Sequence, residues 1–183
     1  MDTLVEYDSR GKLREGLATS WDWDADTLTW TFHLRKGVKF HDGNEMKAED
    51  VKFSLERCIA SPGVNYNYLI ISEINIIDDY TVEFKTSEPC SVLLQRLTLD
   101  AASILSKAAV ESTDDFDSHP VGCGPFKFVS WDTTSGEVVL EAFDEYWEGR
   151  PAIDKLVFKT IPESINRTVA LETKEADIAY DLA

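Results

Sequence analysis

The chain has 183 residues, of which 43% are apolar and 11% aromatic, and its formal net charge is −16. This length and composition suit an ordered globular domain that buries about 70% of the surface of its extended chain. The negative charge excludes a nucleic-acid-binding protein, which needs a surface rich in Lys and Arg, and it opposes binding to anionic membranes.

Three strand patterns lie near the N-terminus. Two short apolar segments, residues 4–7 and 13–17, flank a polar turn. Residues 28–34 alternate apolar and polar side chains, which predicts a half-buried strand. Its apolar face consists of Leu28, Trp30, Phe32 and Leu34.

Three aspartates before that strand have the spacing of a calcium-binding loop: Asp22, Asp24 and Asp26. Such a loop needs Gly at its sixth position and Glu at its twelfth, and Thr27 and His33 stand there instead. We therefore predict a solvated turn and no metal site.

The middle of the chain predicts a helix, a hairpin and a second, shorter helix. Residues 48–59 place Val51, Leu55 and Cys58 on one apolar face. Lys47 stands at the capping position without a hydroxyl, a loss of about 1 kcal/mol unless another group caps the helix. Further along, we expect strands at residues 70–77 and 81–86 and a buried helix at 90–99.

The C-terminal third predicts three more strands and a helix. Residues 126–131 and 137–143 form a hairpin pattern, and residues 153–161 supply a third strand. Residues 163–173 have helical periodicity, with Ser164 as the expected cap. Lys174 follows where a glycine often ends a helix, so we expect an ending without a left-handed residue.

The sequence contains few residue patterns that are typical of a catalytic site. His41 and Asp42 are adjacent, but adjacent side chains of an extended segment point to opposite sides, and no nucleophile stands nearby. Gly122-Cys123-Gly124 precedes a strand, whereas a nucleophile elbow needs a turn from a strand into a helix. We predict no catalytic residue, no metal and no cofactor.

The three cysteines, Cys58, Cys90 and Cys123, cannot all pair with one another, and none forms a C-x-x-C motif. Cys58 lies on the apolar face of the predicted helix, where a free buried thiol is expected. No apolar segment reaches the ~18 residues of a membrane span. The first five residues lack the basic and apolar regions of a secretion signal.

Several ordered motifs resemble the family 5 extracytoplasmic solute-binding proteins, the receptors of peptide and nickel ABC importers. The motifs are LATSW (17–21), FHLRKGVKFHDG (32–43), AEDV (48–51), PVGCGPF (120–126) and DEYW (144–147). The family commonly has Thr or Ser where Cys123 stands, Arg-Asn in place of Ala142-Phe143, and Gly in place of Lys174.

The resemblance implies a mixed α/β fold, one lobe of a type II periplasmic binding protein. Residues 1–16 and 118–183 are expected to form the main sheet of lobe I. The resemblance also implies a short strand at 104–107 that leads into a helix, and a strand at 175–179. The strand at 175–179 would share the main sheet with the hairpin, the third strand and residues 4–7. Residues 17–117 are expected to form an inserted smaller α+β subdomain, and the second lobe to lie outside the chain.

The implied function is capture of peptides for an ABC importer, as an extracytoplasmic monomer whose partners are the transporter's membrane subunits. The protein would be periplasmic or a cell-surface lipoprotein, with its signal segment upstream of this sequence. A nickel chelate, an opine or an oligosaccharide stays open as the ligand, and a secreted hydrolase is the remaining alternative.

The resemblance places five residues at the ligand cleft. Tyr180 and Asp181 follow the predicted last strand, at the position where family members line the cleft. Tyr66, Asn67 and Tyr68 match a loop that reaches the cleft in peptide receptors. The alternative for this loop is that one tyrosine packs in the core and the other is exposed.

Overall fold

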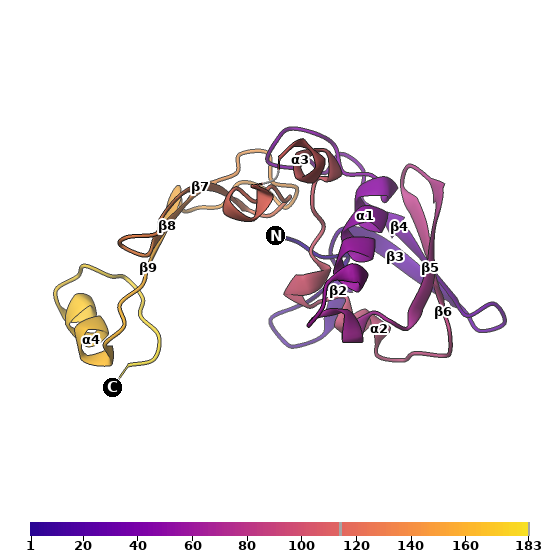
Figure 1. Ribbon diagram of the computed structural model, residues 1–183, viewed down its shortest axis with the longest axis horizontal. Helices are drawn as coiled ribbons and strands as arrows, with labels where there is room; N and C mark the ends of the chain where they lie inside the picture. Colours follow the sequence, from indigo (N-terminus) through magenta and orange to yellow (C-terminus); the bar gives the residue numbers. More distant parts are fainter. Residues whose placement is uncertain (114, 183) are drawn as a thin grey trace.

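The computed structural model describes residues 1–113 and 115–182 and has a compact body and a projecting arm (Figure 1). The fold is mixed α/β, which confirms the predicted class. The body contains one four-stranded antiparallel sheet and a separate two-stranded hairpin. The sheet has the order β3 (Ala18–Asp24), β4 (Thr29–Leu34), β6 (Thr81–Thr86) and β5 (Ile71–Asp78); the hairpin consists of β1 (Val5–Tyr7) and β2 (Leu13–Glu15).

Helix α1 (Ala48–Ala60) packs against this sheet and is joined by shorter helical segments. These are η1 (Asn65–Asn67), α2 (Leu93–Arg96), η2 (Asp100–Ala102), α3 (Lys107–Ser112) and η3 (Phe116–Ser118). The predicted helix at 90–99 is therefore one turn long. None of the helices in the described part of the chain is long and apolar enough to cross a membrane.

The apolar side chains of the body form one continuous core between the sheet and α1. Phe32 and Phe84 meet in its centre with ring centroids 4.8 Å apart. Its fully buried members include Leu4, Val5, Leu17, Phe32, Phe40, Met46, Leu55, Tyr68, Phe84, Leu93, Leu97 and Ile104.

Helix α1 begins without a hydroxyl cap, and Asp50 replaces it. One Asp50 carboxylate oxygen accepts the Lys47 N–H at 2.9 Å, and the other accepts the Lys107 N–H at 3.1 Å. The Ala48 N–H is bound by the carbonyl oxygen of Asp79 at 2.9 Å. Asp50 thus joins the first turns of α1 and α3.

The arm leaves the body at the sequence PVGCGPF as a three-stranded antiparallel sheet, and α4 lies at its far end (Figure 1). The strands are β7 (Phe126–Asp132), β8 (Glu137–Ala142) and β9 (Lys155–Lys159), and the helix is α4 (Ser164–Glu172). These bounds confirm the three predicted strands and the helix that follows them.

Both ends of α4 differ from the prediction. The N-cap residue is Glu163 rather than Ser164, and no side chain caps the helix there. Lys174 itself adopts the left-handed conformation, with φ +62°. This lets the Glu175 N–H reach the carbonyl oxygen of Ala170 at 2.8 Å, so the ending keeps the geometry usual for a glycine.

The expected sheet partners are wrong in two places. Residues 5–7 pair with β2 and contribute to the body core, not to the sheet of the arm. Residues 175–179 form no strand, because a strand needs a hydrogen-bonded neighbour and none pairs with them here. The predicted division at residues 16–17 and 117–118 stays a prediction.

Candidate ligand-binding site

Tyr180 and Asp181 lie on the exposed segment that follows α4. The Tyr180 side chain is 78% exposed, and Asp181 has a left-handed backbone with φ +57°. Arg167 of α4 holds this segment, since its Nη2 donates to the Asp181 carbonyl oxygen at 2.5 Å. Its Nη1 donates to the carbonyl oxygens of Ile161 and Pro162 at 2.7 and 2.8 Å. One guanidinium therefore ties together the segments before and after α4.

In the loop after α1, one tyrosine is exposed and the other is buried in the core, which is the alternative stated for this loop above. Tyr66 is 68% exposed, whereas Tyr68 is fully buried and its hydroxyl donates to the Arg96 carbonyl oxygen at 2.9 Å. Arg96 in turn donates to the Asn67 carbonyl oxygen at 3.0 Å. Burial raises the pKa of Tyr68 to about 12. Tyr68 has no surface for a ligand and instead anchors the loop that presents Tyr66 and Asn67.

The structure does not bring the two expected groups together. Tyr66 and Asn67 belong to the body, while Tyr180 and Asp181 lie at the end of the arm beyond α4 (Figure 1). Within residues 1–113 and 115–182, no hydrogen bond or ion pair joins the two groups.

His41 joins the two motifs that carry the family resemblance most clearly. The Gly122 N–H donates to His41 Nδ1 at 3.4 Å, so Nε2 carries the proton and donates to the Gly124 carbonyl oxygen at 2.9 Å. The ring packs edge-on against Phe143, and desolvation by burial lowers its pKa. His41 thus has a structural role: its contacts hold the base of the arm against the body.

The residues considered for catalysis have structural roles. Asp42 accepts the hydroxyl of Ser106 at 2.7 Å and makes no hydrogen bond with the His41 ring. Cys123 is fully buried, and desolvation raises the pKa of its thiol to about 12. A Cβ at Gly124 would lie 2.9 Å from the Met1 backbone nitrogen, so this glycine permits a close backbone approach.

An open pocket of about 480 Å³ beside the arm base was not expected from the sequence. Its arginines are already engaged: Arg14 forms ion pairs with Glu6 and Glu148, and Arg35 stacks over the Trp147 ring at 4.4 Å. The lining consists of Leu13, Arg14, Glu15, Trp21, Arg35 and Glu148. The Arg14–Glu148 pair connects the hairpin β1–β2 to the arm base, and the Arg35–Trp147 contact connects the end of β4 to it.

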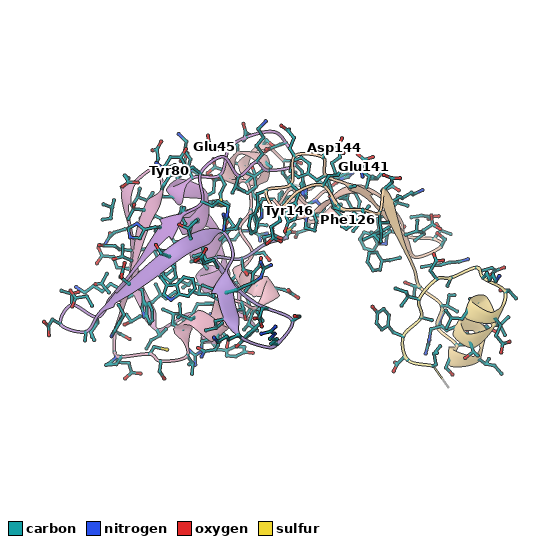
Figure 2. All side chains as sticks on the ribbon, turned by 180° about the vertical axis from the view of Figure 1, so that it is seen from behind. Glu45, Tyr80, Phe126, Glu141, Asp144 and Tyr146 are labelled. Atoms are coloured by element: carbon teal, nitrogen blue, oxygen red, sulfur yellow. The ribbon has the colours of Figure 1, made fainter. Side chains whose placement is uncertain are left out.

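A further ion pair between Lys39 and Glu145 and a hydrogen bond from Trp147 Nε1 to Asp2 at 2.7 Å strengthen this junction. Figure 2 shows Phe126, Asp144 and Tyr146 where the arm meets the body. No cluster of three or more metal-ligating side chains occurs among the described residues.

The mixed α/β fold and the geometry of this site fit one lobe of a solute-binding protein. The model of the bacterial extracellular solute-binding proteins, family 5 Middle, matches residues 12–183, and the chain belongs to this family.

Three relatives illustrate the range of ligands. The dipeptide-binding protein of Escherichia coli K12 is 36% identical over 89% of this chain and 35% of its own length. DppA from Helicobacter pylori, solved with the peptide STSA, is 38% identical with a TM-score of 0.86, over 95% of this chain and 39% of its own. MoaA from A. tumefaciens R10, solved with mannopinic acid, is 32% identical with a TM-score of 0.89, over 96% and 37%. The chain therefore spans little more than a third of the proteins that it matches.

Proposed function

We propose that this chain is part of the peptide-binding component of an ABC importer. The observation that carries the proposal is the unbroken family match over residues 12–183, together with the 38% identity and TM-score of 0.86 to a receptor solved with a bound peptide. The protein acts outside the cytoplasm as a monomer, is exported through a signal segment, and delivers its ligand to the transporter's membrane subunits.

In this proposal the chain supplies one wall of a cleft that closes on the ligand. Tyr66 and Asn67 contribute from the body, and Tyr180 and Asp181 from the arm. The Asp181 carboxylate provides a partner for a peptide ammonium group, and the amide of Asn67 provides hydrogen bonds for a peptide backbone. Tyr68 supports this wall from the core and does not touch the ligand.

A second ligand class within the family, such as an opine or a metal chelate, is favoured by the high structural similarity to the mannopinic acid receptor. Mass spectrometry of ligand that co-purifies with a full-length protein carrying this chain separates the classes. Masses of short peptides support the proposal, whereas an opine or a nickel complex contradicts it.

The chain by itself provides one wall, so we expect calorimetry to detect no peptide binding to residues 1–183 at micromolar concentrations. Micromolar affinity of the isolated chain would contradict this division of the site between two lobes. A matched pair of variants in the full-length protein, Asp181→Asn and Asp177→Asn, tests the wall itself. Only the first is expected to weaken peptide binding.

A further inference from the structure

The segment of residues 177–182, which includes both proposed ligand contacts of the arm, has very few hydrogen bonds. The two residues before it are still held by the end of α4, since both amide groups donate to the Ala170 carbonyl oxygen, at 2.8 and 3.1 Å. Within the part of the chain that the structure describes, the segment itself makes a single hydrogen bond, from Arg167 Nη2 to the Asp181 carbonyl oxygen. The conformation of the segment therefore depends on one side chain of α4.

Asp181 has a backbone conformation that needs such support. Its φ of +57° lies in the left-handed region, which residues with a side chain rarely adopt. Aspartate tolerates this region better than most residues, but a conformation of this kind persists only where neighbouring groups impose it. The Asp181 side chain is exposed, so its own packing does not impose it. The hydrogen bond to its carbonyl oxygen thus fixes the backbone and, through it, the direction in which the carboxylate leaves the chain.

Arg167 has the geometry to hold this backbone in place. Its Nη1 donates to the carbonyl oxygens of Ile161 and Pro162 on the other side of α4, and its Nη2 donates to that of Asp181. All three acceptors are backbone oxygens, and Nε is buried without a hydrogen-bond partner among the described residues. The planar guanidinium holds its donors in a rigid arrangement, so the three acceptors are fixed relative to one another. We assign Arg167 no contact with a ligand, because both Nη groups are bound to backbone.

We propose that Arg167 is a positioning residue of the ligand wall: it fixes residues 177–182 so that the Asp181 carboxylate is directed at the ammonium group of a bound peptide. This inference rests on the proposed function, in which Asp181 contacts the peptide. It makes the effect of Arg167 opposite to the effect of its charge. A nearby cation repels a peptide ammonium group, so loss of the charge alone would strengthen binding, whereas loss of the positioning weakens it.

The first test needs no ligand. NMR relaxation gives the backbone order parameters of residues 178–182 in this chain and in Arg167→Gln, whose side chain is too short to replace the guanidinium. We expect values above about 0.6 in the natural chain and below it in the variant, the limit under which backbone is flexible. Arg150→Gln removes an arginine that binds two aspartates of the arm, and this matched control should change nothing in the segment. Equal order parameters in the natural chain and in Arg167→Gln overturn the proposal.

The second test measures binding in a full-length protein that carries this chain. The probe is STSA, the peptide in the Helicobacter pylori structure, and calorimetry gives its affinity. Arg167→Gln and Asp181→Asn should each weaken binding about ten-fold, the effect expected for one charged hydrogen bond. The double variant should bind no more weakly than either single variant, because both changes remove the same contact. Additive losses would show that Arg167 acts independently of Asp181 and would overturn the proposal.

A third variant separates positioning from charge. Arg167→Lys keeps the positive charge but has a single ammonium group that cannot bind the backbone on both sides of α4. We therefore expect it to bind STSA as weakly as Arg167→Gln does, while Arg150→Gln binds like the natural protein. Full affinity of Arg167→Lys contradicts the proposal. If the natural full-length protein does not bind STSA, that result counts against the proposed function, and the order parameters alone decide the role of Arg167.

Discussion

The body and the arm of this chain differ in what stabilises them. In the body, α1 and the four-stranded sheet enclose a core whose central side chains are fully buried. Among the described residues of the arm from Phe126 onward, the buried apolar side chains are Ala142 and Phe143, next to the body, and Ala170 in α4. The sheet of the arm is held chiefly by its own hydrogen bonds. The hydrophobic effect therefore stabilises the body internally, whereas it contributes little within the arm.

The largest expected effect comes from truncating equivalent aromatic residues in the two regions. Phe32→Ala removes a fully buried ring from the body and should lower the free energy of unfolding by about 3–5 kcal/mol. Phe158→Ala removes a half-exposed ring from the arm and should change it by less than about 0.5 kcal/mol. Urea unfolding followed by circular dichroism measures both, and similar losses would refute the contrast.

The junction between the regions is expected to be next in magnitude. His41→Leu keeps an apolar contact with Phe143 but leaves the Gly122 N–H and the Gly124 carbonyl oxygen without their partners. Each buried unsatisfied group costs about 1–3 kcal/mol. Urea unfolding should show this loss, and amide exchange should be fastest at residues 121–126. If amide exchange became faster only in the far part of the arm, His41 would not be the residue that stabilises the junction.

The same residue gives a smaller, pH-dependent effect. Burial lowers the pKa of His41 below its ordinary value of 6.5; nearby Asp2 favours the charged ring, and Lys127 and the N-terminal amino group oppose it. As the pH falls below about 6.5, the unfolded chain binds a proton on His41 before the folded chain does, so the free energy of unfolding decreases until the folded pKa is passed.

The comparison with His41→Gln isolates this contribution. Burial raises the pKa of Asp2 and Asp50, so these carboxyls favour the folded state on acidification and act in the opposite direction. Urea midpoints at pH 7.5 and 5.5 should fall more for the natural chain than for the variant. If the urea midpoints of the natural chain and of the variant fell equally, protonation of His41 would not cause the loss of stability.

The smallest effect concerns the end of α4. Lys174 has φ +62°, a conformation that glycine adopts without strain, so Lys174→Gly should stabilise α4 by about 1 kcal/mol. Because α4 lies at the end of the arm, the gain should slow amide exchange in α4 without changing the urea midpoint of the body. Glu172→Gly, in the last turn of the helix, is the matched control and should have the opposite effect.

Elements with a clear period were predictable. The strand at 28–34, the helix at 48–59, the hairpin at 70–86 and the three strands of the arm follow from alternating or helical patterns, which reflect a local choice of backbone geometry. The exposed tyrosine of the loop after α1 was not predictable, because Tyr66 and Tyr68 are equivalent in pattern and differ only in what packs against them.

The sequence by itself determined the family, the strands and helices, and the acidic character of this protein, because these depend on residue type and spacing. Only the tertiary structure decided that residues 5–7 join the body, that the His41 ring bonds to the base of the arm, and that Tyr68 lies in the core. It also showed that the strand pattern at 175–179 forms no strand in this chain. The physical reason is the same in each case: burial and sheet pairing depend on partners distant in sequence, and local patterns do not specify which partner is present.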